Sequence, residues 1–235
     1  KATEQNHATA QFNIAALYGN GYGVKRDHEV AMKWLLKAAE QNHASAQFNI
    51  GFFYDNGYGV EQDHKVAIKW YLKAAEQNHA RAQFNIGALY ANGYGVEQDY
   101  KEAMKWYLQA AGQNHARAQY NIGIFFDKGY GVEQNYKEAM KWFLKAAEQN
   151  YAKAQFNLGR IYTNGIGVPK NEKEGAKWYK LAAQNGNEVA QYKLGMGYEN
   201  GCKGLGVPKD KKRLLGGTGR QLSRDLMEPN SIWDR

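Results

Sequence analysis

Four histidines stand at one fixed spacing and are the residues whose type first suggests a metal site. They lie 36 residues apart: His7, His43, His79 and His115. Zinc–nitrogen bonds are about 2 Å long, whereas packed helices lie about 10 Å apart, so single histidines from stacked repeats cannot share an ion. Tyr151 also takes the fifth place of the series. We therefore interpret these histidines as polar residues at helix starts, and the sequence predicts no metal and no cofactor.

Glycine-rich segments and the single cysteine are the other features whose residue types suggest chemistry. Gly21-Tyr22-Gly23 recurs in five repeats, which a single phosphate site would not do. Gly216-Gly217-Thr218-Gly219 lacks the Gly-Lys-Ser/Thr ending and the preceding strand of a phosphate loop. Cys202 lies in an inserted turn, and no Ser-His-Asp set is readable. The sequence therefore predicts no catalytic residue and a protein that is not an enzyme.

A tryptophan recurs at the same spacing and is either an aromatic binding strip or part of the core. The series is Trp34, Trp70, Trp106, Trp142 and Trp178. Each lies near alanines on the apolar side of a predicted helix, where tryptophan is more often core than binding surface. We expect these rings to be buried between neighbouring repeats.

Asparagine recurs on the opposite side of the first predicted helix of each repeat, beside positions that vary. An asparagine amide can bond the backbone of any peptide, while charged and apolar neighbours select its side chains. This pattern predicts a peptide groove; a ladder of asparagines that merely bonds neighbouring helices is the alternative, and the two stay open. The expected binding residues are Asn49, Asn85, Asn121, Asn157, Arg81, Arg117, Lys153, Arg160, Phe52 and Ile124.

The elements that position these residues can be read from the third repeat. Residues 80–92 hold one glycine and no proline, and their apolar residues share one helical face. Gly93-Tyr94-Gly95-Val96 breaks that helix. Asp99 followed by Glu102 has the capping-box pattern that begins a second helix over residues 103–111. The second helices end at Asn42, Asn78, Asn114 and Asn150 and, in the sixth repeat, Gly186, which predicts a left-handed residue there.

The repeats predict one array that begins and ends irregularly. Five full repeats cover 5–184, and a partial sixth covers 185–210, so that the array spans 1–210 and residues 211–235 form a non-repeat extension or tail. Residues 1–4 match the end of a repeat, so we expect the chain to be part of a longer protein. From about Gly216 onward we expect residues outside the regular stack, because three nearby glycines disfavour helix.

This pattern resembles the Sel-one-like repeat, a relative of the tetratricopeptide repeat. That family's unit reads roughly Ala-x-x-x-Leu-Gly-x-x-Tyr, Gly-x-Gly-Val-x-x-Asp and Ala-x-x-Trp-Tyr-x-x-Ala-Ala. The third repeat supplies Ala82, Ile86, Gly87, Tyr90, Gly93, Gly95, Val96, Asp99, Ala103, Trp106, Tyr107, Ala110 and Ala111. The resemblance implies an all-α, superhelical α/α solenoid of 36-residue helix-turn-helix repeats that serves as a scaffold or adaptor.

The net charge of +8 is concentrated towards the end of the chain. The first four repeats together carry +1, the fifth carries +4 and residues 185–235 carry +3. A nucleic-acid-binding array would need a basic stripe along its whole length. We therefore expect a protein or peptide partner with acidic groups and no nucleic acid. No apolar run is long enough for a membrane span; we expect a soluble protein, in the bacterial envelope, secreted or cytoplasmic.

These observations predict a non-catalytic interaction scaffold that binds a peptide or protein on the concave face of the solenoid. Two alternatives stay open. One is an envelope-associated binder of a small ligand of the β-lactam or peptidoglycan type, because some cysteine-rich relatives are linked to β-lactams. With Cys202 alone, this chain departs from that disulfide-stapled subclass. The other is a structural spacer in a longer repeat array.

Overall fold

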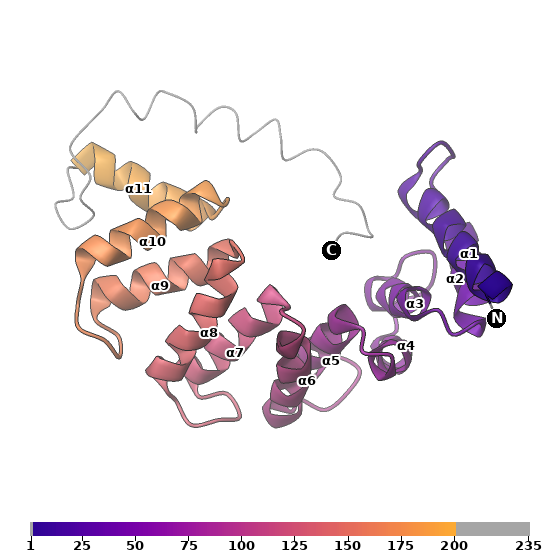
Figure 1. The fold of residues 1–235 in the computed structure, drawn as a ribbon, viewed down its shortest axis with the longest axis horizontal. Coiled ribbons are helices and arrows are strands. Elements are labelled where there is room, and N and C mark those ends of the chain that lie inside the picture. Colours follow the sequence, from indigo (N-terminus) through magenta and orange to yellow (C-terminus); the bar gives the residue numbers. More distant parts are fainter. Residues whose placement is uncertain (1, 201–235) are drawn as a thin grey trace. The chain divides into compact units, whose positions relative to one another are not determined.

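The computed structural model describes residues 2–200, with side chains described from 7 to 194, as α-helices joined by short turns (Figure 1). This confirms the predicted all-α class. The helices of this part of the chain are α1 (Ala2–Asn20), α2 (His28–Glu40), α3 (Ala44–Asn56), α4 (His64–Glu76), α5 (Ala80–Asn92), α6 (Tyr100–Gly112), α7 (Ala116–Lys128), α8 (Tyr136–Glu148), α9 (Ala152–Asn164), α10 (Glu172–Gln184) and α11 (Glu188–Asn200).

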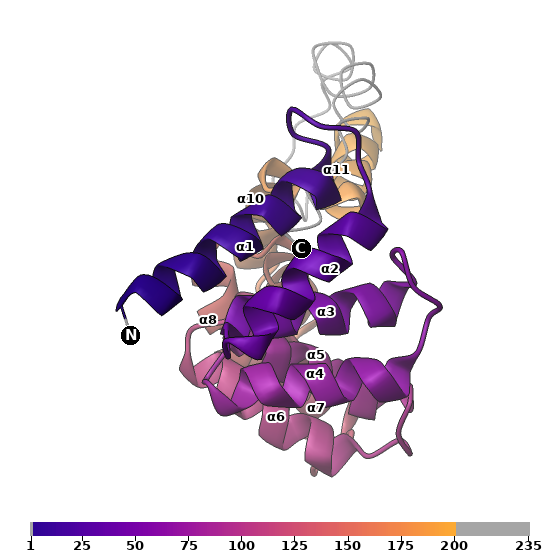
Figure 2. The ribbon, with the colours of Figure 1, turned by 90° about the vertical axis from the view of Figure 1, so that its right-hand side faces the viewer.

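The helices fall into two compact units. The first unit holds α1–α6 and ends at Gln113, and the second begins at Asn114 and holds α7–α11. Within a unit, the odd-numbered first helix of a repeat packs on its even-numbered second helix, and this packs on the next first helix, as α3, α4 and α5 do. Figure 2 shows α1, α2 and α3 of the first unit following one another in chain order. Such nearest-neighbour packing defines a helical-repeat solenoid.

Three of the four histidines begin a first helix. His79 is the N-cap of α5, and its Nδ1 accepts a hydrogen bond from the amide of Ala82 at 3.3 Å. His43 and His115 make the same bond. An accepting ring nitrogen carries no proton, and burial, followed by the charge of Arg81, lowers the pKa of His79 to about 4. The helix-start interpretation is confirmed for these three residues.

The first repeat differs, because α1 begins well before its histidine. His7 therefore lies inside α1, where Gln11 Nε2 is 3.0 Å from its Nδ1. A helix that is already formed at this point leaves no free amide for the histidine to cap.

The second helices begin with half of the predicted capping box. The carboxylate of Asp99 accepts bonds from the amides of Lys101 and Glu102 at 2.8 and 3.0 Å. The reciprocal half is replaced: the Asp99 amide donates to the carbonyl of Tyr90, and the Glu102 carboxylate pairs with Lys105 at 2.6 Å. The glutamate thus stabilises the first turn of α6 through an ion pair on its surface.

The turn after each second helix is left-handed, as predicted. Asn42, Asn78, Asn114 and Asn150 have φ between 60 and 62°, and Gly186 has φ of 87°. Asparagine and glycine are the residues that tolerate this conformation best.

The prediction that the tryptophans form the core is only partly right, because Trp34, Trp70, Trp106 and Trp178 pack against the hydrophobic clusters without being fully buried. All five are half-buried, and the buried position is the residue that follows: Leu35, Tyr71, Tyr107, Phe143 and Tyr179. Neighbouring residues point about 100° apart around a helix, so only one of the two faces the first helix squarely. The tryptophans lie at the margin of the core, where Lys37 lies over Trp34, Lys73 over Trp70 and Lys145 over Trp142 at 4.2–4.5 Å.

A glycine in the middle of α3, α5, α7 and α9 makes room for the buried ring, whereas the first repeat has Ala15 at this position and the smaller Leu35 opposite it. A Cβ built on Gly87 would lie 2.7 Å from Tyr107, closer than real Cβ contacts come. Gly51, Gly123 and Gly159 meet Tyr71, Phe143 and Tyr179 in the same way. This contact brings the backbone of the first helix directly against the second helix.

The sixth repeat begins as a helix. Asn187 caps α11 by accepting a bond from the amide of Ala190 at 2.8 Å. The predicted end of the array at 210, the extension over 211–235 and the departure from the stack near Gly216 lie outside the described residues. Within the part of the chain that is described, no helix combines the length and the apolar character needed to cross a membrane.

Candidate functional site

The recurring asparagines are not a uniform row of open amides. Asn49 is buried, with 3% of its surface exposed, so its side chain cannot line an open groove. Asn85, Asn121 and Asn157 are half-buried. Only part of the predicted series is therefore available to a ligand.

Asn157 also bonds neighbouring helices, which was the alternative role for this series. Its Nδ2 donates to the carbonyl of Lys153 at 3.2 Å and lies 3.5 Å from the hydroxyl of Tyr120 on α7. Its Oδ1 accepts a bond from Nε of Arg160 at 3.3 Å. These bonds fix Asn157 between α7 and α9 and orient the arginine beside it.

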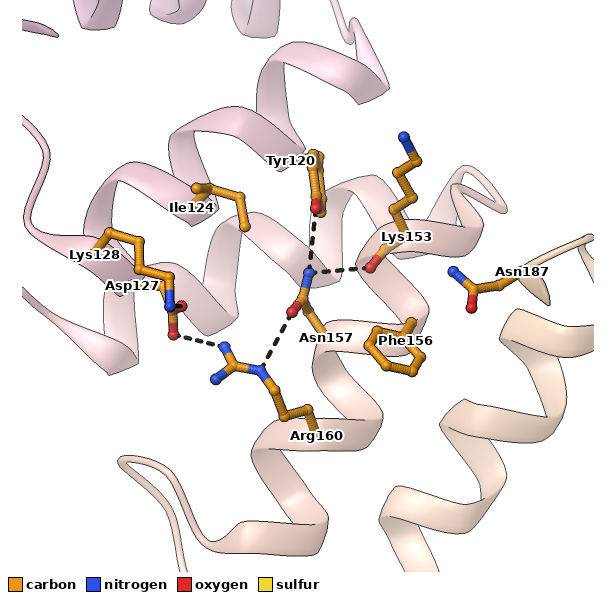
Figure 3. Close-up of a pocket in the computed structure, with 9 residues that line it drawn as sticks. All are labelled: Tyr120, Ile124, Asp127, Lys128, Lys153, Phe156, Asn157, Arg160 and Asn187. Atoms are coloured by element: carbon orange, nitrogen blue, oxygen red, sulfur yellow. Dashed lines mark hydrogen bonds and ion pairs between the residues drawn. The ribbon is translucent and has the colours of Figure 1, made fainter. Parts of the chain in front are cut away.

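The second unit carries a hollow between first helices that we name the basic hollow (Figure 3). Its volume is about 290 Å³, and α7 and α9 supply most of its wall. It brings together four of the predicted binding residues, Ile124, Lys153, Asn157 and Arg160. The full lining is Tyr120, Ile124, Asp127, Lys128, Lys153, Phe156, Asn157, Arg160 and Asn187.

A buried carboxylate organises the cations of the basic hollow. Arg160 Nη2 donates to Asp127 Oδ1 at 2.8 Å, and the ammonium of Lys128 lies 3.3 Å from Oδ2. Only 2% of the Asp127 side chain is exposed, and a buried charge of this kind requires such partners. Lys153 is exposed, and Figure 3 shows its ammonium pointing away from the Arg160–Asp127 pair. Three cations against one carboxylate leave the lining positive.

The first unit carries a second hollow, which we name the acidic hollow. Its volume is about 460 Å³, and the end of α3, the start of α4 and the length of α5 line it. One of the predicted binding residues, Asn85, lies here. The full lining is Asp55, Asn56, Gln62, His64, Asn85, Ala88, Leu89, Asn92 and Tyr94.

Two donors hold the carboxylate of the acidic hollow. Asp55 Oδ1 lies 2.7 Å from His64 Nδ1, and Oδ2 accepts from the hydroxyl of Tyr71 at 3.2 Å. Because a carboxylate only accepts, His64 must carry its proton on Nδ1. Burial raises the pKa of Tyr71 well above its usual value, and the charge of Asp55 adds to this, while a hydrogen bond from Asn85 acts in the opposite direction. The Tyr71 hydroxyl therefore stays protonated and serves as donor.

The remaining predicted residues lie outside both hollows, and several already have partners. The guanidinium of Arg81 lies 4.8 Å from the centre of the Phe48 ring. Arg117 is exposed; burial raises the pKa of Tyr151, and the charge and hydrogen bond of Arg117 act against this rise. Phe52 is half-buried and packs against the core, and Asn121 is half-buried on α7.

Sequence reasoning missed the aspartates that organise the two hollows. Asp55 and Asp127 occupy the same position of the second and fourth repeats, 72 residues apart. The other full repeats have Gly19, Ala91 and Thr163 there, and the partial sixth repeat has Glu199. A comparison of the variable positions, rather than the invariant ones, would have found this signal.

Comparison with known protein families defines the class of this chain. The Sel1 repeat model matches residues 8–43, 44–79, 80–115, 116–151, 152–187 and 189–213. The chain belongs to the Sel1 repeat family, as its resemblance implied. Sel1 repeat proteins are generally protein-interaction scaffolds, and the fold is typically non-catalytic.

Two solved structures share this fold at substantial sequence identity. The chain is 40% identical to a Sel1 repeat protein from Oxalobacter formigenes, with a TM-score of 0.82 over 90% of this chain and 83% of that chain. It is 37% identical to c5321, a protective antigen present in uropathogenic Escherichia coli strains, with a TM-score of 0.80 over 89% of this chain. The match spans 44% of c5321, less than half of its length.

A more distant match shows the fold alone. Immunity protein Pa5087 from Pseudomonas aeruginosa is 21% identical, with a TM-score of 0.59 over 88% of this chain and 78% of that chain. None of the curated protein sequences matches this chain.

Proposed function

We propose that this scaffold binds an extended protein segment carrying acidic groups on the first helices of its second unit. The basic hollow is the observation that carries the proposal. Lys153, Arg160 and Lys128 line it together with Asn157, and Ile124 and Phe156 supply apolar contact area. A ligand carboxylate and an adjacent apolar side chain have complementary surfaces there.

Arg160 is the preorganised element of this surface. Nη2 bonds Asp127 and Nε bonds Asn157, which together use two of the five N–H donors of a guanidinium. The side chain is therefore fixed in direction and retains donors for a second carboxylate. A donor that is already oriented loses less conformational entropy on binding.

Lys153 supplies the more mobile charge. Its side chain is exposed, so it can move to meet a carboxylate of the ligand. Arg117 and Asn121 lie on α7, one of the two first helices that wall the basic hollow. They would extend the binding surface for a longer segment. The peptide backbone would bond to the half-buried amide of Asn121, which can pair with the backbone of any sequence.

A selection followed by affinity measurements tests this proposal. A random peptide library is displayed against the full chain, and the affinities of selected peptides are measured by calorimetry. Selected peptides should be enriched in Asp or Glu beside an apolar residue. Reversing Arg117 and Lys153 to Glu together should weaken them at least about tenfold, because charge-assisted bonds contribute about 1.5–3 kcal/mol each.

A matched control separates this surface from general electrostatics. Lys137→Glu reverses an exposed charge on the second helix α8, outside the lining of the basic hollow, and should leave the affinity almost unchanged. Helicity and melting should stay the same in all variants. If the affinity of the selected peptides is unchanged by the Arg117 and Lys153 reversals but falls for second-helix variants, the binding surface lies elsewhere.

A further inference from the structure

The acidic hollow of the first unit contains an aspartate equivalent to that of the basic hollow of the second unit, but lacks the cations that pair with that residue there. Asp55 and Asp127 occupy equivalent repeat positions. Asp127 pairs with Arg160, which follows it by 33 residues in the chain. The residue that follows Asp55 by the same interval is Ala88, which lines the acidic hollow. The second unit thus supplies a guanidinium where the first has a methyl group.

The second cation is missing in the same way. Lys128 lies next to Asp127 and approaches its carboxylate at 3.3 Å, whereas the equivalent residue beside Asp55 is Asn56. The acidic hollow is also the larger of the two, about 460 Å³ against about 290 Å³. Space and negative charge therefore occur together where the second unit places Arg160.

The exposure of the two carboxylates reflects this difference. The Asp127 side chain is 2% exposed beneath its cations, whereas the Asp55 side chain is 21% exposed. His64 and Tyr71 each donate one bond to Asp55 and occupy about two of the four lone-pair sites of a carboxylate. Two acceptor sites of the Asp55 carboxylate therefore stay open.

We propose that the acidic hollow binds an arginine side chain of a protein partner, whose guanidinium pairs with Asp55 as Arg160 pairs with Asp127. The ring of Tyr94 stacks on His64 at 5.2 Å between ring centres and is still 54% exposed, so it adds aromatic surface for the flat guanidinium. The side-chain amides of Asn85 and Asn92 supply further acceptor oxygens in the same lining. Arg81, the cation on α5, is stacked on Phe48 and is not part of the lining.

This site goes beyond the function proposed above. It lies in the first unit, has the opposite charge and takes a different side chain. Either site can therefore fail its test without affecting the other.

The test uses a short peptide with one arginine, Ac-Gly-Ser-Arg-Ser-Gly-NH₂, and the same peptide with neutral citrulline in its place. Each is titrated into the full chain while NMR records the side-chain amides of Asn85 and Asn92. The arginine peptide should give a saturable shift, and the citrulline peptide should bind at least about tenfold more weakly. D55N should remove the response, because it removes the charge that selects a guanidinium.

Two further variants keep the outcome decisive. A88R should abolish peptide binding with Asp55 intact, because the new side chain occupies the hollow as Arg160 does in the second unit; this holds the test even if D55N disturbs the fold. E76Q removes the same charge at the far end of α4, about 18 Å along the helix from His64, and should leave binding unchanged. Equal binding of the two peptides, an E76Q effect as large as that of D55N, or no saturable shift by about 10 mM peptide would each overturn the proposal.

Discussion

Replacing Leu35 by alanine should destabilise the first unit more than replacing the larger Trp34 beside it. Leu35 is completely buried in the cluster formed by α1, α2 and α3, and Leu→Ala changes in such places cost about 3–5 kcal/mol through lost transfer energy and the remaining cavity. Replacing a fully buried tryptophan by alanine costs a similar amount of stability. Because Trp34 is half-buried, we expect Trp34→Ala to cost about 1.5–2.5 kcal/mol. The better helix propensity of alanine and the lost contact with Lys37, each about 0.5 kcal/mol, nearly cancel.

The assay is urea unfolding followed by far-UV circular dichroism, combined with hydrogen exchange on α2 and α3. Exchange is needed because terminal repeats can open separately from the rest of a solenoid, which makes a single unfolding transition hard to interpret. Lys37→Ala is the matched control: it removes the contact over the Trp34 ring and should cost no more than about 1 kcal/mol. A loss for Trp34→Ala equal to that for Leu35→Ala would refute the assignment of the core to the residue after each tryptophan.

Two further predictions concern the ends of the helices. Asn78→Ala should lower stability by about 1–2 kcal/mol in thermal melts, because alanine is strained at the observed φ of 61°. Asn78→Gly should cost less, since Gly186 occupies the equivalent left-handed position before α11. Equal losses of stability for the two variants would contradict the role of the left-handed turn. For His79, the folded pKa of about 4 lies below the ordinary 6.5, so its contribution to stability is complete above pH 6.5 and is lost as the pH falls towards 4. Melting curves across this range should therefore fall more steeply for the parent than for His79→Asn, which keeps a side-chain cap without a titrating group, and parallel curves would show that the cap does not titrate.

Local signals in the sequence predicted the helices, their turns and several of their caps. The repeat positions of Asn78 and Gly186 predicted the left-handed turns, and those of Asp99 and His79 predicted helix starts. Local sequence is enough for this, because caps and left-handed turns depend on residues within about one turn of one another. The capping box was only half right, since the amide of Asp99 bonds the carbonyl of Tyr90, a partner on another helix that no local pattern indicates.

The candidate site was only partly predictable. The sequence pointed to the variable face of the first helices, and Lys153, Asn157, Arg160 and Ile124 do line one hollow there. It did not reveal that Arg160 is held by Asp127, because that pair joins residues 33 positions apart in different repeats. Nor did it reveal that Asn49 is buried, since the same residue type in the same register is half-buried in the later repeats.

The sequence by itself determined the repeat, the helical class and the family, because each follows from a periodic pattern within a single chain segment. Only the tertiary structure decided which aromatic residue forms the core, because Trp34 and Leu35 are both apolar and differ only in their angle towards the packed neighbour. It likewise decided the charge of each hollow. A carboxylate such as Asp55 or Asp127 is open or neutralised according to the side chain that the next repeat places against it, and that contact exists only once the repeats are stacked.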